Sequence, residues 1–224
     1  MRAGALHKKT IKAEDAAELI PDGASLLIGG FMGVGTPNRI IDALVARGAK
    51  DLEIIANDTA VPDVGIGKLI AANAVRRVVA SHIGLNPQTQ EMMMSGEIEV
   101  ELVPQGTLVE QIRAAGVGLG GFLTPTGLGT SVAEGKEIVT VGDQDYLLEQ
   151  AIWAEFALIS AKNCDYVGNL EYSLTAHNFN PVMALAGKTV IAEPEHILPV
   201  GAIPPDSVKT PGILVDHILE RASK

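Results

Sequence analysis

At the point that decides its fold, the chain reads Leu26-Leu27-Ile28-Gly29-Gly30-Phe31-Met32-Gly33-Val34-Gly35-Thr36-Pro37. The apolar run predicts a buried strand, and the glycines predict a turn whose backbone is bare enough for another molecule or another backbone to approach. A helix is expected from about Pro37 to Arg47, with Thr36 as its cap and Pro37 at its first position, where a missing N–H costs nothing. The free N–H groups of such a turn and helix start would favour an anion or a carbonyl oxygen.

Similar strand–helix units follow along the first half of the chain. Apolar runs predict strands, and helical periodicity predicts the segments between them. The predicted strands are 24–30, 52–56, 75–81 and 98–103, and the predicted helices are 14–20, 37–47, 66–72, 89–95 and 107–115. This alternation favours a parallel sheet with helices on both faces.

Ligands of such sheets bind beyond the carboxyl ends of the strands. Small or polar residues stand at these ends: the turn 29–35, Asn57-Asp58-Thr59, Ser81-His82 and Pro104-Gln105-Gly106. Polar residues after strands are also common in ordinary loops, so this pattern alone leaves both a site and plain loops open.

The rest of the chain changes character. Residues 116–130 are dense in glycine but also carry Phe and Thr, which favours an ordered loop packed on a partner or ligand over a flexible linker. A hairpin is predicted over 137–149, strands over 156–161, 168–172, 188–193 and 212–218, and a helix over 180–186. We therefore expect one α/β domain covering residues 1–224, with an open, mainly parallel sheet and extra β-strands in the C-terminal part.

Composition narrows the classes of partner. The formal net charge of −10 disfavours binding to nucleic acid or to an anionic membrane. Cys164 is the single cysteine, which excludes an internal disulfide or a cysteine-cluster metal site and fits a cytoplasmic location. No apolar run reaches the ~18 residues of a membrane span, and the N-terminus lacks the apolar core of a signal peptide.

Common catalytic motifs are missing from the sequence. The glycines after residue 28 do not follow G-x-G-x-x-G, and Asp58 comes late for a ribose-binding acid. There is no Walker lysine and no G-x-S-x-G elbow. The histidines lack metal-ligand spacing, so we expect no metal, and Cys164 is expected to be a small buried residue.

The run Asp22-Gly23-x-x-Leu26-Leu27-Ile28-Gly29-Gly30-Phe31-x-x-x-Gly35-x-Pro37 resembles the first signature of the family I CoA-transferases. Residues 57–59, 104–107, 121–130, 168–170 and 176–181 resemble the same proteins, so the resemblance covers essentially the whole chain. The chain is most similar to alpha subunits of the family. Residues 32–37 and 81–87 resemble the type that acts on acetoacetate, while 3-oxoadipate and succinyl-CoA:3-oxoacid transferases share the general pattern.

The resemblance implies that the active site is divided between two chains. In this family the nucleophile is a glutamate of the beta subunit, within a Ser-Glu-Asn-Gly stretch that this chain lacks. It implies no catalytic nucleophile in this chain, a beta-subunit partner in an α2β2 assembly, and acyl-CoA and a short-chain carboxylic acid as substrates. Coenzyme A would be a substrate, no other cofactor is expected, and transfer would pass through a glutamyl-CoA thioester.

The resemblance also suggests which residues line the site. Those implied to face the substrate or coenzyme A are Gly29, Gly30, Phe31, Gly33, Gly35, Asn57 and Gln105. A loop carrying Gly121, Phe122, Thr124 and Thr126 would lie near the site or at an interface. Asp58 stands where some relatives have Asn, and repulsion of a carboxylate substrate counts against it as a ligand. Two other readings remain: a nucleotide-binding oxidoreductase domain, and a non-catalytic module that binds a sugar phosphate or another effector.

Overall fold

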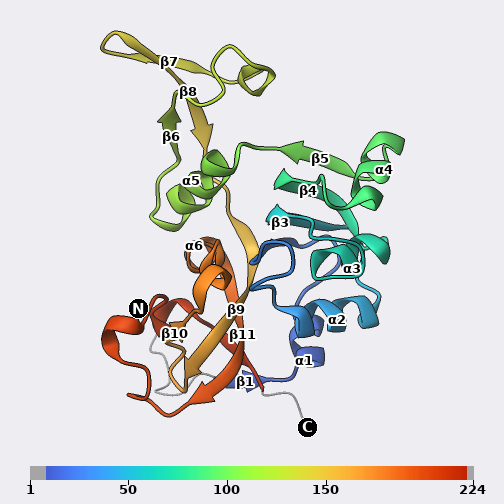
Figure 1. Cartoon of the computed structure of the whole chain (residues 1–224), viewed down its shortest axis with the longest axis vertical. Helices are drawn as coiled ribbons and strands as arrows, with labels where there is room; N and C mark the ends of the chain where they lie inside the picture. Colours follow the sequence, from blue (N-terminus) through green and yellow to red (C-terminus); the bar gives the residue numbers. More distant parts are fainter. Residues whose placement is uncertain (1–8, 221–224) are drawn as a thin grey trace.

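The computed structural model of the chain describes residues 9–220 (Figure 1). Its main sheet has the strand order β1-β12-β11-β9-β2-β3-β4-β5, and all of these ladders are parallel. The strands are β1 (Lys9–Ile11), β2 (Ser25–Ile28), β3 (Leu52–Asp58), β4 (Val75–His82), β5 (Glu99–Leu102), β9 (Ala154–Asp165), β11 (Gly187–Leu198) and β12 (His217–Leu219). A short strand, β10 (Leu170–Glu171), pairs antiparallel with β9.

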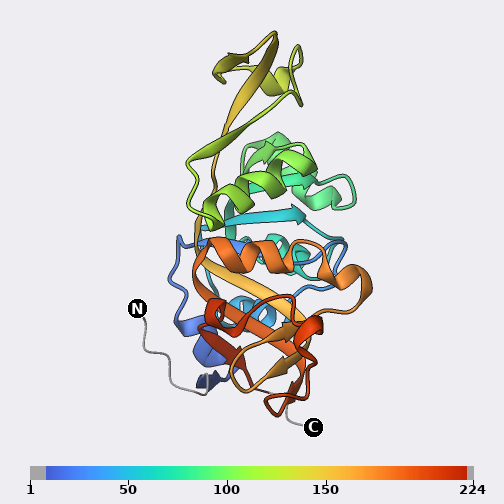
Figure 2. The ribbon, with the colours of Figure 1, turned by 90° about the vertical axis from the view of Figure 1, so that its left-hand side faces the viewer.

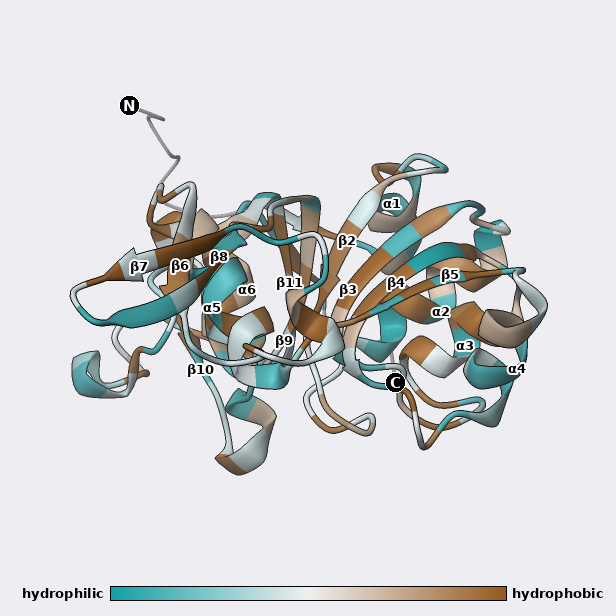
Figure 3. Ribbon diagram, turned by 90° about the horizontal axis from the view of Figure 1, so that it is seen from above, coloured by the Kyte–Doolittle hydropathy of each residue, from teal (hydrophilic) through white to brown (hydrophobic). Residues whose placement is uncertain are grey.

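Helices cover both faces of this sheet, as the alternation of strands and helices predicts (Figures 1 and 2). One face carries α1 (Ala13–Glu18), α2 (Asn38–Arg47), α3 (Ile66–Ala71) and α4 (Pro87–Ser95), and the other carries α5 (Gln105–Gly116) and α6 (Asn180–Ala186). Successive residues of a strand point to opposite faces, so Leu26 and Ile28 pack into the first core while Leu27 packs into the second. The central strands are correspondingly brown in the hydropathy view (Figure 3).

The added antiparallel strands come mainly from the middle of the chain. Strands β6 (Gly121–Thr124), β7 (Ile138–Val141) and β8 (Gln144–Gln150) form a second sheet in the order β6-β8-β7, and we call residues 121–150 the arm. The arm projects beyond α5 and away from the main sheet (Figures 1 and 2). The predicted hairpin is confirmed, with Val141 opposite Gln144 across a two-residue turn.

Three expectations about local structure need correction. Residues 121–124 are a strand rather than part of a loop, because β6 finds a ladder partner in β8. The strand expected over 212–218 is reduced to β12, because Gly212–Leu214 forms a 3-10 turn closed by an N–H of Leu214 that donates to the carbonyl of Pro211. The strand expected over 168–172 is shortened to β10 at Leu170–Glu171, while the C-terminal strands β9, β11 and β12 extend the parallel sheet on the side of β2 away from β3.

The start of α2 also differs from expectation. Pro37 is the cap residue rather than the first helical residue, and no side chain of the cap position accepts a hydrogen bond. The backbone N–H groups of Arg39 and Ile40 donate instead to the carboxylate of Glu193 on β11, at N···O distances of 3.0–3.1 Å. Thr36 is therefore not the cap, because a carboxylate distant in sequence takes that place. The end of α2 is as predicted, with Gly48 in the left-handed region at φ 75°.

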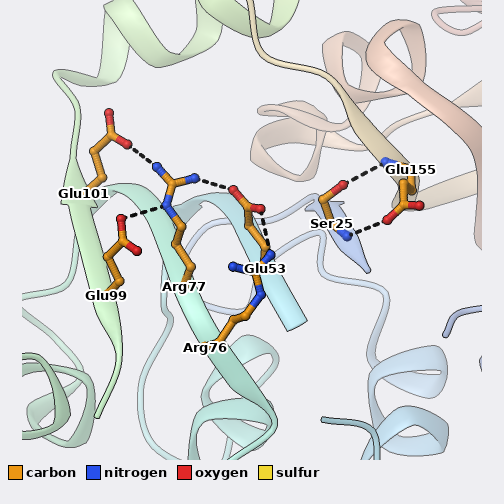
Figure 4. A network of polar contacts seen from close by, with 7 residues as sticks. All are labelled: Ser25, Glu53, Arg76, Arg77, Glu99, Glu101 and Glu155. Atoms are coloured by element: carbon orange, nitrogen blue, oxygen red, sulfur yellow. Dashed lines mark hydrogen bonds and ion pairs between the residues drawn. The ribbon is translucent and has the colours of Figure 1, made fainter. Parts of the chain in front are cut away.

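Ion pairs join the strands at the β5 edge of the sheet (Figure 4). The Arg77 guanidinium on β4 contacts Glu53 on β3 and both Glu99 and Glu101 on β5, with N···O distances of 3.1 Å to Glu99 and 2.5 Å to Glu101. One arginine therefore links three neighbouring strands.

The connections define a crevice at the carboxyl edge of the sheet. From β2 the chain leaves to α2 on one face, while from the neighbouring β9 it passes through β10 to α6 on the other. In open α/β sheets such a switch point is where ligands bind. Within residues 9–220, no helix has the length and apolar character needed to cross a membrane.

Candidate functional site

The residues after β2 form a closed hairpin rather than an open turn. The N–H of Phe31 donates to the carbonyl of Val34 at 3.0 Å, and the N–H of Val34 donates back at 2.9 Å. Between them Met32 and Gly33 both have positive φ, 50° and 83°, as in the type I′ turns that close two-residue hairpins. We call residues 29–36 the glycine hairpin. Its tip presents apolar side chains, with Phe31, Met32 and Val34 exposed to 39%, 46% and 50%.

The glycines of this hairpin are required by contacts within the chain. A Cβ on Gly29 would lie 1.8 Å from Oδ1 of Asn180, and one on Gly30 would lie 2.0 Å from Oγ1 of Thr36. A Cβ on Gly35 would meet the carbonyl oxygen of Ala176 at 2.7 Å, and one on Gly33 would meet Val64 at 2.6 Å. The space left by the missing side chains of these glycines is therefore filled by other segments of the same chain.

Two asparagines at the start of α6 hydrogen bond to the backbone of the glycine hairpin. Asn178 accepts a hydrogen bond from the N–H of Gly30 at 3.2 Å and donates to the carbonyl of Val34 at 3.3 Å. Asn180 donates to the carbonyl of Gly35 at 2.9 Å and accepts from the N–H of Ser160 on β9 at 3.0 Å. Sequence reasoning assigned these asparagines no role, because their partners in the hairpin lie more than a hundred residues away. A local signal is their position at the start of a predicted helix.

On the other side, the hairpin meets the end of β3. Oδ2 of Asp58 accepts a hydrogen bond from the N–H of Met32 at 3.0 Å, and the Asp58 residue is buried, with 2% exposed. Burial raises the pKa of the Asp58 carboxyl above its ordinary value, while the N–H groups of Met32 and Ala60 and the nearby His82 act to lower it. The buried Asp58 carboxylate thus fixes the backbone of the hairpin at Met32.

Asn57 and Gln105 reach the same edge of the sheet from different elements. Asn57 is buried at the end of β3, and Oγ of Ser81 on β4 lies 2.7 Å from its backbone oxygen and 2.8 Å from its Oδ1. Gln105 is the first residue of α5, directly after β5, and is exposed. His82 is exposed at the end of β4, opposite Asp58 in the ladder. The same carboxyl edge therefore carries the glycine hairpin after β2, Asn57 at the end of β3 and Gln105 after β5, which is three strands from β2 in the sheet order.

The arm residues do not join this group through any described contact. Gly121, Phe122 and Thr124 lie on β6, which packs against β8 and α5, and Thr126 follows in the next turn. A Cβ on Gly121 would lie 2.4 Å from the carbonyl oxygen of Glu149, so this glycine is set by packing within the arm.

A cavity of about 510 Å³ opens on the β9 side of the glycine hairpin. It is lined by residues 33–36 of the hairpin, the start of α2, residues 160–162 of β9 and residues 193–195 of β11. Neither Asn57 nor Gln105 belongs to its lining. Its cations are paired: Nε of Arg39 lies 3.4 Å from Glu193, and Nζ of Lys162 lies 2.5 Å from Glu195.

Glu193 changes what the α2 start can bind. Burial raises the pKa of its carboxyl, while the N–H groups of Arg39 and Ile40 and the Arg39 guanidinium favour the ionised form. The protein thus supplies its own anion to the helix N-terminus, the position that a nucleotide pyrophosphate occupies in dinucleotide-binding folds. The expectation of free N–H groups at this point is wrong, and the nucleotide-binding interpretation loses its main support.

Possible catalytic groups among the described residues include the thiol of Cys164 and the side chains that can ligate a metal. Cys164 is buried, and burial raises the pKa of its thiol to about 12, so it remains protonated. Within residues 9–220 no group of three or more His, Cys, Asp or Glu side chains is placed to hold a metal ion.

Comparison with known proteins places this arrangement in a family. A model of the coenzyme A transferase family matches residues 10–221. The alpha subunit of the acetate CoA-transferase of Escherichia coli (strain K12) is 52% identical over 214 residues, covering 96% of this chain and 97% of the relative. The alpha subunit of the acetoacetyl-CoA:acetate/butyrate CoA transferase of Clostridium acetobutylicum is 46% identical, covering 96% and 99%. A subunit of the probable succinyl-CoA:3-ketoacid coenzyme A transferase of Bacillus subtilis (strain 168) is also 46% identical, covering 98% and 92%.

Solved structures have the same fold. The apoenzyme of the acyl-CoA transferase YdiF from Escherichia coli O157:H7 superposes with a TM-score of 0.83 at 26% identity, covering 95% of this chain and 47% of that one. The chain thus spans about half the length of that transferase chain. The family match over residues 10–221, the identity to proteins named as alpha subunits and the shared fold all point to the same family. The chain therefore belongs to the coenzyme A transferase family, and within it to the alpha-subunit type.

Proposed function

We propose that this chain is the alpha subunit of an enzyme that moves coenzyme A between a short-chain acyl-CoA and a 3-oxoacid such as acetoacetate. A beta subunit would supply the nucleophilic glutamate. The observation that carries this proposal is that the two buried carboxylates beside the glycine hairpin already hydrogen bond to backbone N–H groups. Asp58 and Glu193 both accept backbone N–H groups, so neither is free to attack a thioester. The edge offers amide groups, and these contacts support an attacking carboxylate that comes from another chain.

The comparisons support this division of labour. The three relatives described above match over nearly their whole length and are named as subunits of transferases, two of these three as alpha subunits. The YdiF transferase chain is about twice as long as this chain. A second chain of similar size would supply the missing half. We propose an α2β2 assembly, in which the carboxyl edge faces the beta subunit.

The proposed reaction has two half-reactions. The partner carboxylate attacks the acyl-CoA carbonyl, breaking its C–S bond to give a mixed anhydride and the coenzyme A thiolate. The thiolate then attacks the glutamyl carbonyl of that anhydride, forming an enzyme thioester and releasing the first acid as its carboxylate. The second acid collects coenzyme A by the reverse steps. This is covalent catalysis by a carboxylate, with coenzyme A as substrate and no metal or other cofactor called for.

This chain's contribution would be to bind and to stabilise charge. Each attack places negative charge on a carbonyl oxygen, and a preorganised donor aimed at it is worth about 3–4 kcal/mol. The Asn57 and Gln105 amides are the candidates for such contacts, because both stand at the carboxyl edge that also carries the hairpin. Asn57 is also held in place by Ser81, so it would lose little freedom on binding.

A CoA-transfer assay on the chain co-purified with its partner tests the proposal. The pair should be active and the isolated chain inactive; turnover by the isolated chain would overturn the divided site. Asn57→Ala and Gln105→Ala should each lower kcat/KM by about a hundredfold. Gln144→Ala, an exposed amide of the arm, is the matched control and should leave turnover unchanged. Unchanged turnover in both edge variants would remove these residues from the site.

The choice of acids has a second candidate with its own support. The relative named for succinyl-CoA and 3-ketoacids is as similar as the one named for acetate and butyrate. Succinyl-CoA, or 3-oxoadipate as acceptor, is therefore the alternative. A panel of acetate, butyrate, succinate and 3-oxoadipate against acetoacetyl-CoA separates the two, since a dicarboxylate preference in kcat/KM would contradict the acetate and butyrate assignment.

A further inference from the structure

Left-handed backbone points to an unexpected role for Asp58. Among the described residues, six that are not glycine have positive φ: Met32, Asp51, Ala60, Asp63, Asn73 and Leu174. Asp and Asn tolerate this conformation, whereas residues with ordinary side chains adopt it at a cost. That leaves Met32, Ala60 and Leu174 as the positions that need outside support.

The Asp58 carboxylate contacts two of these three positions. Its Oδ2 accepts the N–H of Met32, at φ 50°, with an N···O distance of 3.0 Å. The N–H of Ala60, at φ 54°, acts on the same carboxylate and lowers its pKa. Ala60 lies two residues after Asp58, the spacing of an Asx turn, whereas Met32 lies on a different element. One buried side chain thus accepts a hydrogen bond from the first left-handed turn and interacts with the N–H of the second.

We propose that Asp58 is a positioning residue that clamps the glycine hairpin to the end of β3 by holding Met32 and Ala60 in the left-handed conformation. The clamp fixes the tip of the hairpin relative to Asn57, which precedes Asp58 on the same strand. Its consequence for catalysis rests on the proposed function, since the hairpin and Asn57 form the wall that the acyl group would meet. The side chain of Asp58 contacts the backbone of the hairpin at Met32.

The chemistry explains why a carboxylate suits this place. It has two oxygens that accept hydrogen bonds and no donor to conflict with either N–H group. An asparagine keeps one accepting oxygen and turns an NH₂ group toward the other position. Burial raises the pKa of this carboxyl, while the N–H groups of Met32 and Ala60 act to lower it. Asp58→Asn should therefore weaken the clamp partly, and Asp58→Ala should remove it.

Amide hydrogen exchange on the isolated full-length chain tests the clamp without any assay of function. In Asp58→Ala, the segment covering residues 30–34 should exchange at least about tenfold faster than in the wild type, because a hydrogen bond to a charged group is lost. Asp58→Asn should give an intermediate rate. Asp42→Asn, which removes an exposed carboxylate of α2, should not change exchange in this segment. Equal exchange in wild type and Asp58→Asn would overturn the proposal, even if Asp58→Ala fails to fold.

A double-mutant cycle with Met32→Gly asks whether Asp58 acts through the left-handed turn. Glycine removes the cost of positive φ at residue 32, so the clamp should matter less there. In the co-purified pair, Asp58→Ala should lower kcat/KM about tenfold or more in the wild-type background and less than about threefold in the Met32→Gly background. Loss in kcat should exceed any rise in the KM for acyl-CoA. An equal loss in both backgrounds would contradict a role through Met32.

The two readouts keep this inference separate from the proposed function. Faster exchange in Asp58→Ala together with an inactive wild-type pair would support the clamp and reject CoA transfer. An active pair with unchanged exchange in the Asp58 variants would do the reverse.

Discussion

The parallel sheet buries β2, β3 and β4 between helices on two faces, whereas the arm has one buried apolar side chain, Leu147, among its residues 121–150, all of which the structure describes. The sheet is stabilised by two hydrophobic cores. The arm depends on its ladders and on a polar contact at its root, where the buried carboxylate of Glu149 binds Lys136 and Gln111 of α5 at 2.7 and 3.1 Å. An apolar side chain in the parallel sheet should therefore contribute much more to stability than a similar side chain in the arm.

The largest expected effect is in the core. Leu44→Ala removes a side chain that is 0% exposed between α2 and the sheet, and it should lower the free energy of unfolding by about 3 kcal/mol through lost burial and a new cavity. Ile138→Ala, at a position of the arm that is 55% exposed, should cost about 0.5 kcal/mol or less. Urea unfolding measures both, and equal costs would mean that the arm is as well covered as the sheet.

The glycine hairpin should be the next most sensitive place. Gly29→Ala places a Cβ at 1.8 Å from Oδ1 of Asn180, so Asn180 has to move and its hydrogen bonds to Gly35 and Ser160 are lost. We expect a loss of about 2 kcal/mol in urea unfolding. Gly120→Ala, at the root of the arm, meets nothing within 4 Å and should change stability by less than about 0.5 kcal/mol. A tolerant Gly29 would contradict the packing explanation of that glycine.

Breaking the root of the arm should give a smaller and local effect. Glu149→Ala leaves Lys136 and Gln111 without their acceptor, and because Lys136 is partly exposed we expect a loss of about 1.5 kcal/mol. Limited proteolysis should then cut within residues 121–150 while the parallel sheet stays intact. Glu110→Ala, whose pair with Arg113 is half exposed, should not raise cleavage. Global unfolding of Glu149→Ala would show that the arm and the sheet are one cooperative unit.

The smallest expected effect is on the pH dependence of stability. Burial raises the pKa of Asp58 in the folded chain, so stability present below the unfolded pKa is lost as the pH rises through the folded pKa. Asp58→Asn carries no charge at any pH. Its Tm relative to wild type should therefore increase by about 2 °C from about pH 4 to about pH 8. His82 faces the same carboxylate, so the scan is repeated in a His82→Asn background; a difference in Tm that falls with pH would contradict the sign.

Much of the fold can be predicted because its signals are local. Apolar runs and helical spacing locate the strands and helices of the first half, Gly48 marks the end of α2, and Gly142-Asp143 marks the hairpin turn of the arm. Repeated strand–helix units then leave few alternatives to a parallel sheet. The same logic places Asn57 and Gln105 at one edge, because the carboxyl ends of parallel strands meet there.

The sequence by itself thus determined the class of fold, the edge that carries the candidate site and, through the resemblance, the family. Only the tertiary structure decided why the glycines stand where they do, what occupies the start of α2 and what Asp58 holds. Asn180 meets Gly35 across 145 residues and Glu193 meets Arg39 across 154. No local pattern encodes such pairs, because they form only after β9 has paired with β2 and β11 has paired with β9. This strand order depends on the packing of the whole sheet.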